Sequence, residues 1–371
     1  MSDNIHTKGY TGFSPFLGLV KASGGGAIHS MAKIQFIHSY QHIISLDNLL
    51  EAWKEFLNGK RGRNDVQIFQ RTLMENIITL HKDLLSKTYK HASYMPFNIS
   101  DPKPRNIHKA TVRDRLLHHA LYKSLYPFFD KTFTADSYSC RVGKGVHKAM
   151  ERFRDFSNKI SKNNTKTVWV LKCDIRKFFA SIDHTVLAEI IKEYIPDKDI
   201  QWLFEEVVES FHTHTEGVGL PLGNLTSQLL VNVYMNKLDQ FVKHTVKAKH
   251  YIRYADDFVF LSDNKVWLET ILHQISLFLQ ERLKLSLHPD KVFIKTLASG
   301  VDFLGWVHFP NYRVVRTVTK RRMWKRLEKT EGKEETVQSY LGLLSHGNAK
   351  NIARAIAIQY TVVHRQDIRI D

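Results

Sequence analysis

The stretch that decides the fold has the sequence Ile252-Arg253-Tyr254-Ala255-Asp256-Asp257-Phe258-Val259-Phe260-Leu261. Two adjacent carboxylates stand between two runs of β-branched and aromatic residues. This pattern predicts a strand, a tight turn that carries the acidic pair, and a second strand. Uncompensated charges are costly inside an apolar core, so the acidic pair should meet cations or solvent. For the dipeptide alone, an ordinary acidic turn is the simpler explanation.

A third carboxylate upstream changes this interpretation. Residues 168–173 form an apolar run typical of a strand buried on both faces, and the run ends at Asp174. A basic and aromatic segment, residues 176–179, follows. Carboxylates at the ends of neighbouring strands offer hard oxygen ligands to two divalent cations, as in-line nucleotidyl transfer requires. Asp174, Asp256 and Asp257 are therefore the predicted catalytic residues.

Three segments in chain order resemble the motifs of reverse transcriptases. Asp174 with residues 178–179 resembles the first catalytic motif, and residues 254–257 resemble the YxDD box. Between them, residues 219–228 (GLPLGNLTSQ) resemble the motif that lines the template and the nucleotide. The resemblance covers more than half of the chain and is closest to the enzymes of diversity-generating retroelements. It implies an RNA-directed DNA polymerase with an α+β right-hand fold: fingers, a palm with an antiparallel sheet, and a helical thumb.

The resemblance also implies an organisation into subdomains. The expected parts are an N-terminal extension, partly flexible, over 1–45; fingers over 46–167; a palm with some fingers elements, the YxDD hairpin and the primer grip over 168–312; and a basic helical thumb over 313–371. Apolar spacing predicts helices over 46–57, 66–85, 184–194, 199–210, 228–242 and 265–283. Residues 94–107 are predicted to form an extended hairpin.

Composition limits the class of partner. The 371 residues include 54 Lys and Arg against 37 Asp and Glu, which gives a formal net charge of +17 and a pI near 9.6. This excess favours a polyanionic partner, mainly through phosphate contacts and counterion release. An acidic membrane surface would also attract the chain, but the sequence has no apolar run of about 18 residues and no signal-peptide core. No membrane insertion is expected.

The cysteines and histidines do not predict a metal centre. Cys140 and Cys173 have no metal-ligand spacing, so they are expected to be free thiols in a reducing, cytoplasmic environment. Residues 212–216 (HTHTE) alternate ligand-type side chains but lack a further partner nearby. They are predicted to form a polar strand edge rather than a zinc site.

Around the carboxylates, the resemblance assigns roles to individual residues. The implied nucleotide-binding residues are Lys103, Arg105, Arg141, Phe179, Leu222 and Gln228. Phe179 matches the steric gate, whose ring would stack under a deoxyribose and exclude a 2′-hydroxyl. Lys291 matches the lysine that protonates the pyrophosphate leaving group. The alternatives are a basic hairpin without a ligand at Lys103 and Arg105, a simple turn at Arg141, a core ring at Phe179, and a surface lysine at Lys291.

A second group of residues is implied to contact the primer and the template. Its members are Gly223, Tyr254, Leu304, Gly305, Arg321 and Lys325. Residues 303–307 resemble the primer-grip hairpin, where Gly305 lets backbone approach the primer terminus. The basic segment that follows is expected to be the helical thumb, although a solvated charged helix would have a similar composition.

The motif at 219–228 departs from most reverse transcriptases at two places. Most of them have a glutamine where this chain has Leu222, and Ser-Pro where it has Ser227-Gln228. This departure matches the diversity-generating lineage, whose enzymes are error-prone opposite template adenine. Leu222 removes an amide that could check the nascent base pair through hydrogen bonds, which predicts reduced fidelity. The alternative is a packing variant with ordinary fidelity.

The expected cofactor is a pair of Mg²⁺ ions, for which Mn²⁺ could substitute, held by Asp174, Asp256, Asp257 and the backbone carbonyl of Ile175. The expected partners are an RNA template, a DNA primer or product, and dNTPs. A structured noncoding RNA, a small accessory protein and an oligomer remain open.

Several biological settings also remain open. One is a diversity-generating retroelement, and another is a defence-associated enzyme that copies a noncoding RNA. A retron is the weaker third, since residues 348–352 (NAKNI) depart from its motif. A catalytically silent RNA-binding scaffold is opposed by the intact carboxylates.

Overall fold

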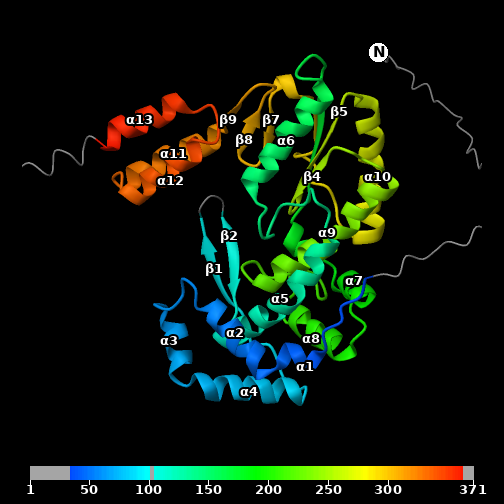
Figure 1. Ribbon diagram of the computed structural model, residues 1–371, viewed down its shortest axis with the longest axis vertical. Helices are drawn as coiled ribbons and strands as arrows, with labels where there is room; N and C mark the ends of the chain where they lie inside the picture. The colour runs from blue at the N-terminus through cyan, green and yellow to red at the C-terminus, as the bar shows by residue number, and fades with distance from the viewer. Residues whose placement is uncertain (1–33, 101–103, 362–371) are drawn as a thin grey trace, which may run out of the picture. The chain divides into compact units, whose positions relative to one another are not determined.

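The computed structural model describes residues 34–100 and 104–361. The chain divides into two units, Met1–Ile34 and Gln35–Asp371, and the elements below belong to the second. The expected flexibility of the N-terminal residues and the predicted site residue Lys103 lie outside the described residues. The second unit combines helices with antiparallel sheets, so the predicted α+β class is correct (Figure 1). No helix within the described ranges is long and apolar enough to cross a membrane.

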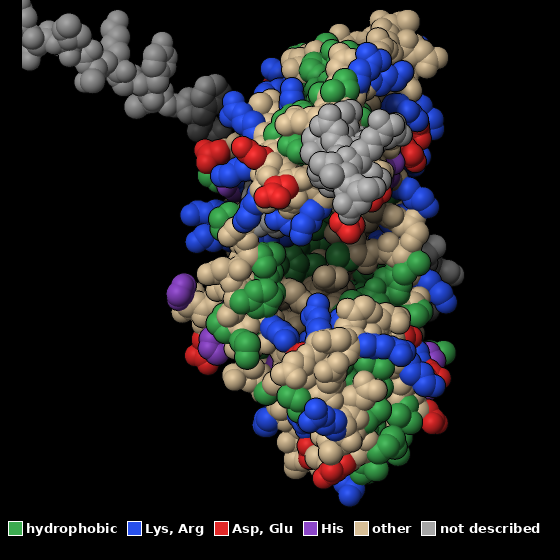
Figure 2. Space-filling view, turned by 90° about the vertical axis from the view of Figure 1, so that its left-hand side faces the viewer, with side chains coloured by type: hydrophobic (Ala, Val, Ile, Leu, Met, Phe, Trp, Pro, Cys, Tyr) green, Lys and Arg blue, Asp and Glu red, His purple; other side chains and the backbone are tan. Residues whose placement is uncertain are grey.

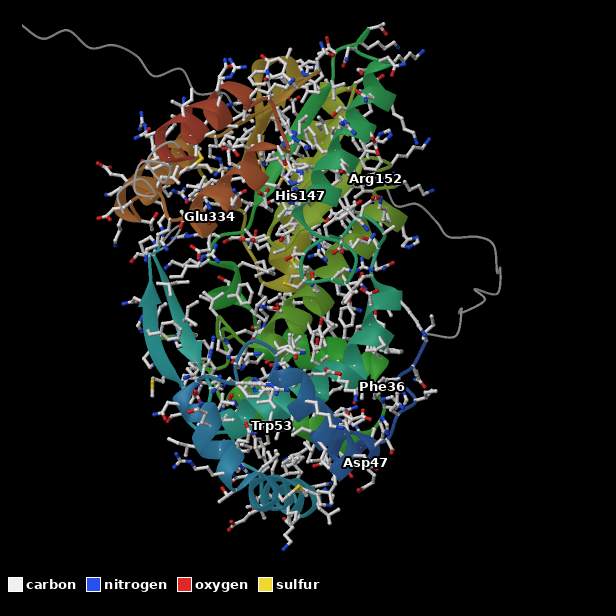
Figure 3. All side chains as sticks on the ribbon, turned by 60° about the vertical axis from the view of Figure 1, so that its left-hand side comes forward. Phe36, Asp47, Trp53, His147, Arg152 and Glu334 are labelled. Atoms are coloured by element: carbon white, nitrogen blue, oxygen red, sulfur yellow. The ribbon has the colours of Figure 1, made fainter. Side chains whose placement is uncertain are left out.

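The first part of this unit is a helical cluster. Its helices are α1 (Tyr40–Ile44), α2 (Leu46–Phe56), α3 (Asn64–Arg71), α4 (Leu73–Leu85) and α5 (Val112–Thr132). The Ser45 hydroxyl accepts a hydrogen bond from the Asn48 amide at 3.2 Å and so caps α2. In α2 the apolar Trp53 is buried while Asp47 is exposed, as the amphipathic spacing predicts (Figure 3). The single helix expected over 66–85 is instead two helices, because Thr72 has non-helical dihedrals (φ −118°, ψ 39°).

A hairpin extends from this cluster, formed by β1 (Met95–Ile99) and β2 (Arg105–Lys109) (Figure 1). Strand β2 of this hairpin is hydrogen-bonded to the 219–228 motif. The His108 amide donates to the Leu222 carbonyl at 3.0 Å, and the Asn224 side chain donates to the His108 carbonyl at 3.3 Å. The hairpin and the motif therefore form one hydrogen-bonded unit, although more than a hundred residues separate them in the sequence.

The central sheet has four antiparallel strands in the order β4-β5-β3-β6. They are β3 (Trp169–Asp174), β4 (Tyr251–Tyr254), β5 (Asp257–Ser262) and β6 (Phe293–Thr296). Alternate residues of β3 enter different cores: Val170 packs with Phe153 and Phe156 of α6 (Val146–Ser161), whereas Leu171 joins the cluster that holds α9 (Leu225–Gln240) and α10 (Lys265–Leu283). Helices thus bury both faces of the sheet, which explains the continuous apolar run of β3.

The connections correct two predictions. After β3 come η1 (Phe178–Ser181), α7 (His184–Tyr194) and α8 (Lys198–Glu209). Residues 212–216, between α8 and α9, form a turn instead of the predicted strand edge. Nearby, Val218 pairs with Asp183 through one isolated bridge. Helix α9 begins at Leu225, three residues before the predicted start, with Asn224 as its N-cap. It continues into a π-helical turn, η2 (Phe241–Thr245). Helix α10 has the predicted bounds.

The C-terminal part starts with a second antiparallel sheet of β7 (Val301–Phe303), β8 (Trp306–His308) and β9 (Arg313–Val315), preceded by η3 (Leu297–Ser299). Helices α11 (Thr317–Lys329), α12 (Glu334–Leu344) and α13 (Lys350–Thr361) follow. Their core includes Trp306 and Met150, which joins them to β8 and α6. The ring centroids of His147 and His346 lie 3.7 Å apart, which adds a contact between α6 and the segment just after α12. Residues 313–315, expected in the helical thumb, are a strand.

Candidate active site

The three predicted carboxylates come together at one end of the central sheet. Asp174 is the last residue of β3 and Asp257 the first of β5, and the antiparallel register places them directly opposite each other. Asp256 precedes Asp257 in the turn between β4 and β5. Their side chains are mostly removed from solvent, with 15% of Asp174 and 20% of Asp257 exposed. Like charges directly opposite each other repel, so this arrangement requires positive charge nearby.

The turn itself is narrower than the sequence predicts. Tyr254 pairs with Asp257 across the hairpin, so only Ala255 and Asp256 form the turn, and Asp257 belongs to the strand. Ala255 has φ +56°, a conformation that hairpin turns usually give to glycine, asparagine or aspartate. A side chain at this φ costs roughly 1–3 kcal/mol and persists only where its surroundings fix it.

Burial makes two of the carboxylates, Asp256 and Asp257, reluctant to ionise. Burial raises the pKa of Asp257 to about 7, opposed by Lys172 and reinforced by the charges of Asp174 and Asp256. Burial also raises the pKa of Asp256, with the charge of Asp174 as the next cause and Arg105 among the opposing ones. Arg105 stands at the exposed start of β2, and its positive charge acts against the rise in the pKa of Asp256.

Two lysines supply positive charge to Asp174 and Asp257, the carboxylates that face each other across the sheet. The Lys172 Nζ lies 3.4 Å from Asp257 Oδ2, and its side chain is 9% exposed. The Lys291 Nζ donates to Asp174 Oδ1 at 2.8 Å. Lys291 was predicted on resemblance alone, and the structure places its ammonium group against one of the carboxylates. Lys172 was not predicted, although a lysine inside an apolar strand is a recognisable sign of a buried partner.

The donor chemistry of the site suits a divalent cation. Carboxylate oxygens are hard ligands of the kind that Mg²⁺ prefers, and the Asp257 Oδ1 is buried with no hydrogen-bond partner. Ile175, whose carbonyl was also predicted as a ligand, pairs with Leu287 through an isolated bridge. Across residues 34–100 and 104–361, no three His, Cys, Asp or Glu side chains are gathered closely enough to hold a metal ion.

Phe179, the predicted steric gate, lies in η1, which follows the end of β3 in the chain. Its ring is half-buried and packs edge-on against the buried ring of Phe178, with ring centroids 5.6 Å apart. Its carbonyl accepts a hydrogen bond from the Leu220 amide at 2.8 Å. The position of the predicted steric gate is therefore fixed directly by the 219–228 motif.

Within that motif, Gly223 makes a close approach. Its φ is +106°, and a Cβ added there would lie 2.8 Å from Cγ2 of Ile107 in β2. Leu222 and Gln228 are both half-buried. The glycine lets the motif lie against the hairpin, and Leu222 is held there through its carbonyl.

Arg141 has a different environment from the one expected for a nucleotide ligand. Its side chain is 6% exposed and forms an ion pair with Asp130 at 2.7 Å. The guanidinium group also donates to the carbonyls of Asp130, Thr134 and Ser137. These contacts give Arg141 a structural role in the loop before α6, and its contact with a nucleotide stays a prediction.

The predicted primer and template residues lie on the palm and beyond it. Leu304 and Gly305, with φ +52° and +85°, form the tight turn of the β7–β8 hairpin. Tyr254 is half-buried at the end of β4. Arg321 and Lys325 are exposed on α11 and form no ion pair within the part of the chain that the structure describes. Figure 2 shows Lys and Arg side chains gathered on the upper part of one face, above a hollow lined in part by hydrophobic side chains.

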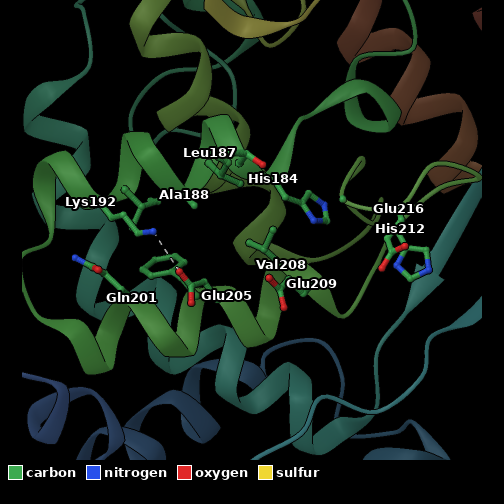
Figure 4. Close-up of a pocket in the computed structure, with 14 residues that line it drawn as sticks. His184, Leu187, Ala188, Lys192, Gln201, Glu205, Val208, Glu209, His212 and Glu216 are labelled. Atoms are coloured by element: carbon green, nitrogen blue, oxygen red, sulfur yellow. Dashed lines mark ion pairs between the residues drawn. The ribbon is translucent and has the colours of Figure 1, made fainter.

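A cavity of about 500 Å³ lies elsewhere, between α7, α8 and the 212–217 turn (Figure 4). Its lining is mainly apolar, and an ion pair of 3.5 Å between Lys192 and Glu205 lies at one side. None of the predicted site residues lines it. The predicted catalytic residues therefore lie outside this cavity.

Comparison with known proteins decides the family. The profile of a family described as "Reverse transcriptase (RNA-dependent DNA polymerase)" matches residues 98–308, more than half of the chain and including all three carboxylates. The chain belongs to the reverse transcriptase family. Membership confirms the predicted enzyme class, an RNA-directed DNA polymerase, and with it the right-hand polymerase fold.

Curated relatives of this reverse transcriptase include several intron proteins. Protein YkfC of Escherichia coli is 25% identical over 311 residues, which cover 71% of this chain and 80% of YkfC. The group II intron-encoded protein LtrA of Lactococcus lactis is 23% identical, and the match covers 62% of this chain and 47% of LtrA. A putative COX1/OXI3 intron 2 protein of Saccharomyces cerevisiae is 21% identical, covering 73% of this chain and 38% of that protein. The reverse transcriptase spans less than half the length of the last two.

Among solved structures, a truncated apo telomerase from Candida tropicalis superposes with a TM-score of 0.47 and 12% sequence identity. That match covers 66% of this chain and 60% of the telomerase chain.

Proposed function

We propose that this reverse transcriptase extends a DNA primer on an RNA template at the end of the central sheet, with Asp174, Asp256 and Asp257 as ligands of two Mg²⁺ ions. The observation that supports this most directly is the register of β3 and β5, which places two carboxylates opposite each other, with the third in the adjoining turn. A bound divalent cation would supply Lewis acidity at the primer 3′-oxygen and neutralise charge on the triphosphate.

The remaining roles belong to the chain's own side chains. Arg105 brings positive charge from the hairpin toward the triphosphate, and Lys103 and Arg141 stay as further nucleotide contacts in this proposal. The Phe179 ring orients the sugar and excludes a 2′-hydroxyl. Lys291, held 2.8 Å from Asp174, holds the proton that the leaving pyrophosphate takes up. Positioning and charge neutralisation thus account for most of the catalysis.

The proposal is tested by Asp174→Asn and Asp256→Asn. Each substitution keeps the shape of the side chain and removes a negative ligand, so primer extension on RNA should fall below about 1% of the unsubstituted rate while RNA affinity stays within about twofold. Asp263→Asn is the matched control, because Asp263 is exposed beyond the end of β5. Extension that survives either substitution would overturn the assignment.

We further propose that the enzyme belongs to a diversity-generating retroelement and copies template adenine with reduced fidelity. Leu222 and Ser227-Gln228 support this, since Leu222 lies in the motif next to the hairpin and offers no side-chain hydrogen bond to a base pair. A small accessory protein is the partner that this setting would require, whereas a structured noncoding RNA is the template expected for the alternative, a defence-associated enzyme.

Fidelity tests this finer proposal. Leu222→Gln restores an amide and should lower misincorporation opposite template adenine by about tenfold, since one good hydrogen bond contributes about 1–1.5 kcal/mol. Leu222→Met is the matched control, because it keeps an apolar side chain of similar volume. Sequencing of primer-extension products gives the error frequency. Equal error frequencies in all three proteins would refute the role of Leu222.

A further inference from the structure

Arg253, the second residue of the stretch that decides the fold, is fully buried in β4. A buried guanidinium group is costly unless every donor is paired. Here all five N–H donors have partners. They are the two carboxylate oxygens of Asp239 at 2.8 and 2.7 Å, Asn232 Oδ1 at 3.1 Å, Ser137 Oγ at 2.9 Å, and the Ala255 carbonyl at 3.2 Å.

The partners of Arg253 lie on two elements with roles in the proposed site. Asp239 and Asn232 belong to α9, the helix that starts from the 219–228 motif. Asp239 is also fully buried, and it accepts a further hydrogen bond from the Tyr251 hydroxyl at 2.8 Å. The Ala255 carbonyl belongs to the turn that carries Asp256. Arg253 therefore connects the helix behind the nucleotide motif with the turn that holds a carboxylate.

This connection explains how the unfavourable turn is maintained. Ala255 adopts φ +56°, where a glycine would be relaxed. The hydrogen bond from Arg253 holds the carbonyl of this same residue, and the bidentate pair with Asp239 fixes the guanidinium plane. The backbone of Arg253 is fixed as well, because its amide donates to the Asp136 carbonyl and its carbonyl accepts from the Tyr138 amide, both at 2.9 Å.

We propose that Arg253 is a positioning residue for polymerisation: together with Asp239 it holds the Ala255 carbonyl, and so sets the place of Asp256 relative to Asp174. The inference rests on the proposed role of Asp256. A purely structural pair would contribute stability only. A positioning pair also determines the rate of the chemical step, because a displacement of about 1 Å at a reacting group can cost about 100-fold.

Apolar replacement separates these two roles. Arg253→Met leaves the buried charge of Asp239 unpaired, and Asp239→Leu leaves that of Arg253 unpaired. Each single variant should therefore lower Tm by on the order of 5–10 °C. The double variant removes both charges, and buried ion pairs replaced by apolar side chains often recover stability. Its Tm should return toward that of the unsubstituted enzyme, whereas kcat for single-nucleotide addition should stay about 100-fold low with KM for dNTP little changed.

Two further variants keep the test decisive. Arg253→Lys retains a positive charge for Asp239, but an ammonium group lacks the planar fork that reaches Asp239 and the Ala255 carbonyl together. The loss of kcat in this variant should therefore be larger than its loss of Tm would explain. Tyr251→Phe removes a hydrogen bond to Asp239 without touching the turn, so kcat should stay within about twofold. Binding of Mn²⁺ to the protein alone, followed by electron paramagnetic resonance, provides a readout without turnover, and it should weaken in the double variant.

Recovery of both Tm and kcat in the double variant would overturn the inference, as would full kcat in Arg253→Lys. If the double variant does not recover its Tm, the Arg253→Lys result decides. Failure of the proposed function gives a different result, because Asp256→Asn would then remain active whatever Arg253 does.

Discussion

At the scale of single residues, most predicted catalytic positions needed only local sequence. The acidic pair and the upstream aspartate are the kind of groups that a strand end presents, and the structure brings Asp174, Asp256 and Asp257 to one place. Partners brought from a distance were not predictable in this way. Lys172 shares a strand with Asp174, but its link to Asp257 depends on the sheet register, and the pairing of Arg253 with Asp239 depends on how α9 packs.

Gly223 carries a prediction at the same scale. Gly223→Ala places a Cβ at φ +106° and 2.8 Å from Ile107, so the free energy of unfolding should fall by roughly 1–3 kcal/mol. Urea unfolding measures this change. Gly62→Ala is the control, since a Cβ at Gly62 meets nothing within 4 Å and Gly62 has no positive φ, and it should not destabilise the protein. Equal stability of both variants would contradict the close approach of motif and hairpin.

At the scale of elements, apolar periodicity predicted helices well and their interruptions poorly. The spacing over 265–283 gives α10 with the observed bounds. Apolar spacing marks neither the break at Thr72 nor the early start of α9. At the break, the Asn76 side chain donates to the Phe69 carbonyl and to the Thr72 hydroxyl, and at the start of α9 the Asn224 side chain donates to the His108 carbonyl of β2. Alternating polar residues at 212–216 suggested a strand edge. A strand forms only where a neighbouring strand can pair with it, and the described part of the chain offers one isolated bridge there, between Asp183 and Val218.

His308 in β8 provides a prediction about pH. Its side chain is 4% exposed, and burial lowers the pKa of His308 to about 4 from the ordinary 6.5. The folded state thus takes up the proton later than the unfolded chain as pH falls. Keeping His308 neutral therefore contributes to the free energy of unfolding in full above about pH 6.5. This contribution, roughly 2–4 kcal/mol, is lost as the pH falls from 6.5 to 4.

His308→Gln should make the stability less dependent on pH in that window, because glutamine does not titrate and its amide can donate to the Phe303 carbonyl in place of the ring. Urea unfolding of both proteins at several pH values between 4 and 7 gives the difference. The other buried histidines remain in the variant, so the subtraction isolates His308. Parallel curves for the two proteins would contradict the prediction.

At the scale of the whole molecule, the net charge of +17 favours a polyanionic partner such as nucleic acid. Arg321 and Lys325 are exposed on α11 without ion pairs in the described part of the chain, and we propose that they contact the template–primer backbone. Replacing both by glutamine should weaken duplex binding and reduce the slope of log affinity against log salt by about 2. Lys265→Gln is the control, because Lys265 pairs with Glu269 in α10, and its slope should match the unsubstituted protein. An unchanged slope in the double variant would remove α11 from the interface.

The register between β3 and β5 has a consequence for where the chain can change length. One added residue in β3 would move each later side chain to the opposite face and shift Asp174 out of register with Asp257, and one added residue in β5 would move every side chain after it to the opposite face. Catalysis and folding would then fail together, so neither strand can absorb an insertion. Residues 162–167, by contrast, are exposed and contribute no core side chain. This connection between α6 and β3 is where a reporter peptide or a purification tag could enter the middle of the polymerase while both strands stay aligned.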